Sequence, residues 1–96
     1  MYKDKSVDKL IHMLSLLDGE KEIGALMYDL CTIKELKDMA ARFETALMLD
    51  NKENYQEISH KIGTSSATIS RVNRCLNYGD GGYAKAIEVY KKSLKK

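Results

Sequence analysis

The sequence contains no proline, only two cysteines and no run of 18 apolar residues. A bilayer-spanning helix needs about that many apolar residues in succession, so we expect no membrane partner. The first 20 residues are charged and periodic, and they lack the apolar core of a signal peptide. These absences together predict a cytoplasmic protein.

Cys31 and Cys75 stand alone, with no CxxC motif and no histidine at the spacing of a metal ligand. In a reducing compartment such cysteines stay as thiols and act as small apolar side chains. We therefore expect two half-buried free thiols, with no disulfide, no metal and no cofactor.

Charge is unevenly distributed along the chain, although the formal net charge is only +2. Residues 1–63 carry nine Lys and Arg against twelve Asp and Glu, a balance of −3. Residues 64–96 carry seven against two, a balance of +5. A basic end on a slightly acidic body suits a polyanion such as nucleic acid, although lysine-rich ends often only add solubility.

Apolar residues recur at helical spacing throughout the chain, and no segment of useful length alternates like a β-strand. Capping boxes at Thr32–Glu35 and Asn54–Glu57 indicate two helix starts. We predict an all-α fold, a single domain over residues 1–96 with about six helices near 7–17, 23–30, 32–49, 54–61, 65–77 and 83–94.

Three glycines follow the fifth predicted helix, at Gly79, Gly81 and Gly82. Glycine adopts positive φ angles without strain, so we expect all three to do so where the chain turns. A phosphate-binding loop is the alternative, but no strand precedes the cluster and no GK[ST] motif follows it.

Several predicted helices are apolar on more than one face. Met13 and Leu16 lie off the apolar stripe of the first helix, and Met48 and Leu49 lie off that of the third. A 96-residue monomer cannot easily cover so much apolar surface, which favours a homodimer over ordinary exposed side chains.

Residues 54–77 have the spacing of a helix-turn-helix. Ser59 is small where the two helices cross, Gly63 makes the tight turn, and Ile69 anchors the second helix in the core. Ile58, Ile62 and Val72 add apolar support. A generic helical corner is the plain alternative.

The second helix of this motif presents a short, hydroxyl-rich face that suits the major groove of double-stranded DNA. Hydroxyls contact phosphates or bases, small methyl groups pack on thymine, and arginine binds guanine or phosphate. For each serine alone, helix capping explains the residue equally well. The candidate DNA-binding residues are Gln56, Ser65, Ser66, Ala67, Thr68, Ser70, Arg71 and Arg74.

The stretches LKDMAAR and IGTSSATISRVNRCL resemble the Trp repressor family, and NRCLNYGDGGYAKAIE resembles its YerC/YecD-type branch. The resemblance covers roughly residues 30–88. It implies an intertwined helical homodimer that regulates transcription, as a repressor, by reading two half-sites about 34 Å apart.

The resemblance also implies a corepressor site in which an indole lies between Arg42 and Arg71. Val72 replaces the glycine that leaves room for the indole, and Cys75 replaces a serine near its amino group. A β-branched residue fills such a space, and a thiol is a poor polar partner, so we expect no response to tryptophan. Arg42 either lines a remodelled effector pocket or is a solvated or ion-paired side chain.

Two other functional classes are alternatives to DNA binding. The low net charge and the absence of a basic N-terminal arm suit a protein-interaction module that has lost specific DNA recognition. An enzyme is not expected, because His12 and His60 share no nearby Ser, Cys or acidic partner in sequence.

Overall fold

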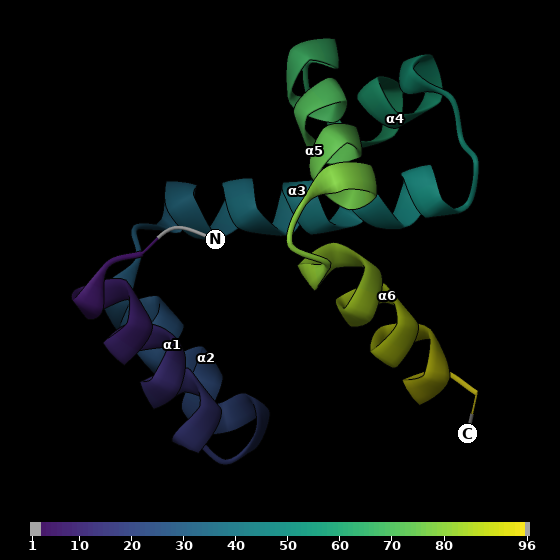
Figure 1. Ribbon diagram of the computed structural model, residues 1–96. Helices are drawn as coiled ribbons and strands as arrows, with labels where there is room; N and C mark the ends of the chain where they lie inside the picture. The colour runs from purple at the N-terminus through teal and green to yellow at the C-terminus, as the bar shows by residue number, and fades with distance from the viewer. Residues whose placement is uncertain (1–2, 96) are drawn as a thin grey trace. The chain divides into compact units, whose positions relative to one another are not determined.

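The computed structural model describes residues 3–95 (Figure 1). Within this range it contains no strand and six helices: α1 (Lys5–Leu16), α2 (Gly19–Leu30), α3 (Ile33–Asp50), α4 (Tyr55–Ile62), α5 (Ser66–Tyr78) and α6 (Gly82–Ser93). The all-α prediction is confirmed, and each predicted helix is present with ends shifted by a few residues. None of these helices combines the length and apolar character that crossing a bilayer requires.

Local caps explain where the helices begin. At α3, the Glu35 amide donates to the Thr32 hydroxyl at 3.1 Å, and the Thr32 amide donates to the Glu35 carboxylate at 2.8 Å. The hydrogen bond from that amide, with one from the hydroxyl, holds the pKa of Glu35 below its ordinary value. The predicted capping box at the start of α3 is therefore present.

The glycine cluster between α5 and α6 corrects one prediction. Gly81 has a φ of +86°, but Gly79 and Gly82 lie outside the left-handed region. At Gly79, a Cβ atom would sit 2.4 Å from the Cys75 carbonyl oxygen. Glycine is needed there because the backbone passes too close for a side chain, and its freedom to adopt positive φ is not used.

The chain divides into two compact units, one ending at Lys37 and the other beginning at Asp38. In the first unit, neither α1 nor α2 has a buried residue. The large apolar side chains that remain exposed in this unit are Leu10, Ile11, Met13, Leu16, Ile23, Tyr28, Leu30 and Ile33.

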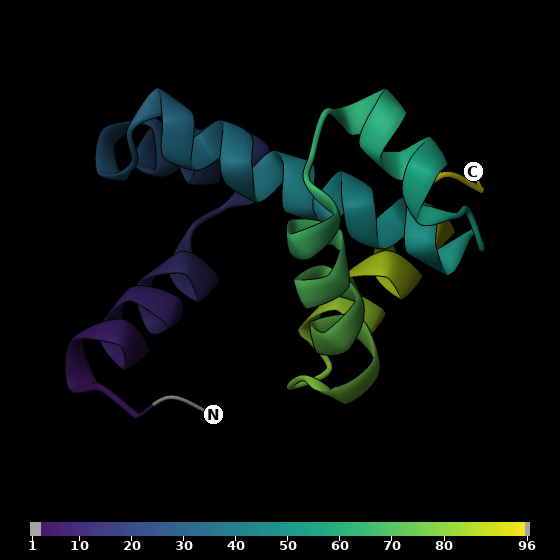
Figure 2. The same cartoon turned by 90° about the horizontal axis from the view of Figure 1, so that it is seen from above.

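In the second unit, α4, α5 and α6 gather around the C-terminal half of α3 (Figures 1 and 2). Two buried clusters join these four helices: Ala46, Val72 and Ile87 form one, and Met48, Ile58 and Ile69 form the other. Met48 and Leu49, whose off-stripe positions had favoured a dimer, pack under α4 and α5 instead. Their part of the dimer argument is therefore withdrawn.

Candidate nucleic-acid interface

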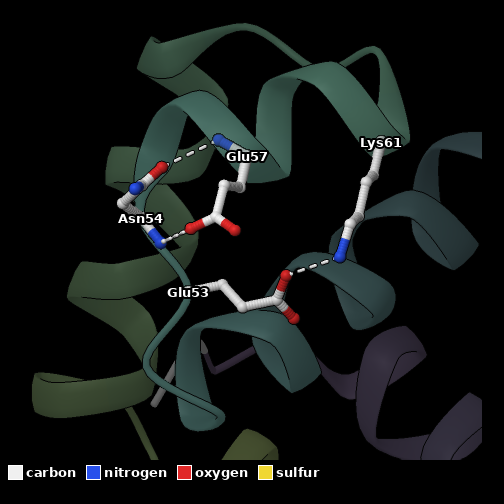
Figure 3. A network of polar contacts seen from close by, with 4 residues as sticks. All are labelled: Glu53, Asn54, Glu57 and Lys61. Carbon is white, nitrogen blue, oxygen red and sulfur yellow. Dashed lines mark hydrogen bonds and ion pairs between the residues drawn. The ribbon is translucent and has the colours of Figure 1, made fainter.

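A capping box fixes the start of α4 (Figure 3). The Glu57 amide donates to the Asn54 side chain at 2.8 Å, and the Asn54 amide donates to the Glu57 carboxylate at 3.3 Å. These contacts satisfy two amides near the helix end that no intrahelical carbonyl serves. The predicted box is present, and it sets the register of the first helix of the motif.

The only lysine of α4 already has an acidic partner. Lys61 Nζ lies 2.9 Å from Glu53 Oε1, in the segment just before the helix (Figure 3). The hydrogen bond to Glu53, together with the charge of that carboxylate, raises the pKa of Lys61. Consequently α4 presents no unpaired lysine or arginine to a partner.

Gly63 makes the turn between α4 and α5. Its φ of +77° and ψ of 24° are left-handed, and its amide donates to the Ser59 carbonyl at 2.8 Å. Ser65 then caps α5, because its hydroxyl accepts from the Thr68 amide at 3.2 Å and donates to the Thr68 hydroxyl at 3.1 Å. The turn and the cap together place α5 immediately after α4.

The second buried cluster holds the two helices together. Ile58 on α4 and Ile69 on α5 are both 0% exposed and pack with Met48 of α3. Ile62 lies at the edge of this cluster, and Ser59 is partly buried. Burying an isoleucine fully stabilises a fold by about 1.5–3 kcal/mol, so these contacts fix the angle between α4 and α5.

The other side of α5 faces solvent. Most candidate DNA-binding residues are there, whereas Ser65 is committed to the cap and Thr68 is partly buried. The exposed candidates that are not part of the cap are Gln56 on α4 and Ser66, Ala67, Ser70, Arg71 and Arg74 on α5.

The arginines of α5 differ from the neighbouring lysines in their partners. Lysines of the second unit pair with acids in three places: Lys61–Glu53, Lys85–Glu88 and Lys91–Asp50. Neither Arg71 nor Arg74 has an ion pair or side-chain hydrogen bond to another residue between 3 and 95. Two positive charges on α5 are therefore available to an anion from outside the chain.

The residues predicted for an effector pocket lie in different surroundings. Arg42 is exposed on α3 and has no ion pair within the described part of the chain. Val72, directly after Arg71, is 2% exposed and packs with Ala46 and Ile87. The side chain of Val72, the residue after Arg71, thus lies in the core of the second unit.

Cys75 lines a cavity of about 440 Å³ beside the end of α5, which we call the Cys75 cavity. Its other lining residues are Phe43, Gly79, Asp80, Gly82, Tyr83 and Ala86, and Arg42, Arg71 and Val72 are not among them. Both cysteines are free thiols; Cys31 is partly buried as expected, but Cys75 is exposed, so that half of the prediction is wrong. No group of side chains able to hold a metal ion occurs between residues 3 and 95.

A second hollow, of about 390 Å³, lies between α4 and the start of α5, and we call it the α4–α5 hollow. It brings the predicted residues Gln56 and Ser66 together with Tyr55, Ser59 and His60. Sequence reasoning had not assigned the last three to a binding site. One signal was available, because Tyr55–Ser59 and Gln56–His60 are each four residues apart and so share a helix face.

Comparisons with known proteins identify the family of this chain. The family model described as Trp repressor protein matches residues 5–91. The uncharacterized protein YerC of Bacillus subtilis (strain 168) is 40% identical over 91 residues, which cover 95% of this chain and 88% of that protein.

Two solved structures have a similar fold. One is the crystal structure of a TrpR-like protein from Eubacterium eligens ATCC 27750, with a TM-score of 0.85, 40% identity, and coverage of 93% of this chain and 92% of that one. The other is a Trp repressor candidate from Staphylococcus aureus, with a TM-score of 0.84, 29% identity, and coverage of 93% and 89%.

Proposed function

This chain belongs to the Trp repressor family of DNA-binding regulators, and we propose that it is a sequence-specific transcriptional repressor. It inserts α5 into the major groove of double-stranded DNA as a homodimer. Binding does not depend on tryptophan.

The exposed face of α5 is the observation that carries this proposal. Short side chains at Ser66, Ala67 and Ser70 allow the helix backbone to approach base edges closely. Arg71 and Arg74 supply unpaired positive charge on the same helix. A hydroxyl-rich start followed by two arginines suits base contacts at the helix tip and phosphate or guanine contacts one turn later.

Fluorescence anisotropy with a duplex selected from genomic DNA tests the proposal. The affinity should fall steeply with salt, because phosphate contacts release counterions. Arg71→Ala and Arg74→Ala should each weaken binding. Each lost phosphate contact should also reduce the slope of log affinity against log salt concentration by about 1. Lys21→Ala, which removes the same charge from α2, is the matched control. If both arginine variants bind as the parent does while remaining folded, the groove assignment is wrong.

The homodimer is supported by the apolar surface that one copy leaves uncovered. In the first unit Leu16 is 62% and Tyr28 is 70% exposed, and on α6 Val89 and Tyr90 are exposed as well. Water contact with so much apolar surface is unfavourable, and a second copy would remove it. Sedimentation equilibrium should give a dimer, and Leu16→Lys should shift the population to monomer. A monomeric parent at micromolar concentration would exclude this arrangement.

Independence from tryptophan is supported by Val72, which replaces the glycine next to Arg71 and whose side chain is buried against Ala46 and Ile87. Arg42 is then a solvated side chain of α3, as its exposure and lack of an ion pair within residues 3–95 suggest. The affinity for the selected duplex should be the same with and without saturating tryptophan. A strict requirement for tryptophan would overturn this interpretation of Val72.

One observation favours a protein-interaction module instead. Because Lys61 is paired with Glu53, the helix-turn-helix has only two unpaired lysine or arginine side chains, both on α5. Affinity capture after nuclease treatment distinguishes the two functions. Recovery of one specific protein partner, with no DNA enriched in cells, would favour the module.

A further inference from the structure

The Cys75 cavity has an apolar floor. Phe43 of α3 and Tyr83 of α6 line it, and both pack against the buried cluster of Ala46, Val72 and Ile87. Pockets that bind small molecules enclose about 300–1,000 Å³. A volume of about 440 Å³ therefore suits a ligand with one ring better than a large cofactor.

Aromatic rings form part of the wall of this cavity. The ring of Phe43 lies edge-on to that of Tyr90, with the centroids 6.0 Å apart and an angle of 87° between the planes. This contact restricts the orientation of Phe43. Because the faces of aromatic rings carry partial negative charge, a wall of this kind accepts an apolar body and also attracts a cation.

The charged side chain at the cavity is acidic. Asp80 is among the lining residues, and no lysine, arginine or histidine between residues 3 and 95 is among them. Asp80 already has a partner within the chain. A carboxylate offers about four lone-pair sites, so it can accept from a ligand at the same time.

The end of α5 adds partial negative charge at the same place. Cys75 begins the last turn of this helix, and that turn contains no basic residue. The last carbonyls of a helix have no intrahelical donor, and the helix dipole is negative there. The start of α6 has the opposite polarity, but Asp80 lies directly before its N-cap, Gly81, and supplies a full negative charge. A cation is therefore favoured over an anion.

We propose that the Cys75 cavity binds a small primary amine that carries an aromatic or other apolar body. The body packs on Phe43 and Tyr83, and the ammonium group lies beside Asp80 and the end of α5. An amino acid suits the cavity less well, because no cation lines it to pair with a carboxylate. This site is separate from the pair formed by Arg42 and Arg71, neither of which lines the cavity.

Calorimetry of the full chain with four small probes tests the ligand class. We expect 2-phenylethylamine to bind about threefold more tightly than 2-phenylethanol, the gain of one exposed ion pair. Ethylamine should bind more weakly because it lacks the ring, and 3-phenylpropionate should bind most weakly because it is an anion. If 3-phenylpropionate binds as tightly as 2-phenylethylamine, the proposed ligand class is wrong.

Two variants with matched controls locate the site. Ala86→Leu should abolish binding of 2-phenylethylamine by filling the cavity, whereas Ala84→Leu, also exposed on α6 but outside the lining, should not. Asp80→Asn should reduce the affinity for the amine to that for the alcohol, whereas Asp29→Asn on α2 should leave it unchanged. An Ala86→Leu variant that binds as the parent does would overturn the inference, since this exposed position leaves both buried clusters intact.

The thiol of Cys75 provides an independent readout. In a Cys31→Ser background, saturating 2-phenylethylamine should slow the reaction of Cys75 with methyl methanethiosulfonate several-fold, and ethylamine at the same concentration should not. A Cys75 that reacts only after unfolding in urea would mean that a second copy covers the cavity, and the inference would fail. None of these measurements contains DNA, so their failure would leave the proposed function standing.

Discussion

The hydroxyl of Ser65 accepts a hydrogen bond from the Thr68 amide at 3.2 Å and donates one to the Thr68 hydroxyl at 3.1 Å. Ser65 is therefore part of the helix cap, whereas the neighbouring Ser66 has a free hydroxyl within residues 3–95. Two adjacent serines on the same exposed loop–helix junction thus have different roles, one in folding and one in the proposed binding.

This difference predicts that alanine lowers stability at one serine and DNA affinity at the other. Ser65→Ala should lower the free energy of unfolding by about 1 kcal/mol, the usual loss for an N-cap. Ser66→Ala should leave stability nearly unchanged and weaken DNA binding several-fold. Urea unfolding at fixed protein concentration and anisotropy measure the two quantities. Equal stability losses in both variants would contradict the assignment of the cap to Ser65 alone.

The turn between α4 and α5 predicts a cost for Gly63→Ala. A side chain at the left-handed φ of +77° is strained although no atom lies within 4 Å of its Cβ, so we expect a loss of about 1 kcal/mol. Gly82→Ala is the control, since it also has open space but lies outside the left-handed region. Thermal denaturation should separate the two, and a stable Gly63→Ala would show that the turn tolerates another geometry.

The buried cluster under the helix-turn-helix predicts a graded response to small deletions. Ile69→Val removes one methylene from a fully buried side chain and should cost about 1 kcal/mol. Ile62→Val, at the partly exposed edge of the same cluster, should cost less. Chemical denaturation of both variants checks the order, and the reverse order would mean that α5 does not pack through Ile69.

The capping box of α3 predicts a pH-dependent contribution to stability. Since the Thr32 amide and hydroxyl lower the pKa of Glu35 from its ordinary 4.5, the carboxylate stabilises the folded state above that pH. The contribution is lost as the pH falls through the lowered pKa. Glu35→Gln should therefore be less stable than the parent at pH 7 and equal to it in stronger acid. Glu44→Gln, which removes a charge from mid-helix without touching a cap, is the control. If Glu35→Gln stays less stable than the parent in strong acid, the carboxylate is not the source of the difference.

The parts of the fold that depend on local chemistry were predictable from the sequence. Asn54 and Glu57 are three residues apart and form their capping box without help from the rest of the chain. The spacing of Ser59, Gly63 and Ile69 likewise predicted the turn and the burial of Ile69, because a helix-turn-helix needs a turn residue and an apolar anchor at fixed offsets.

The parts that depend on packing between helices were not predictable. Met48 lies off the apolar stripe of α3, and it is buried only because α4 and α5 cover it. Position 79 must be glycine because a Cβ there would meet the backbone of Cys75, and no sequence pattern indicates this contact. The α4–α5 hollow forms where two helices meet, so the sequence alone did not place His60 beside Ser66.

Selection of genomic fragments by the purified protein, with and without tryptophan, tests the central proposal most directly. We predict enrichment of one palindromic site, unchanged by tryptophan and lost in an Arg71→Ala/Arg74→Ala variant that remains folded. No enrichment above the input library, or equal enrichment by that variant, would contradict the proposal that α5 reads DNA.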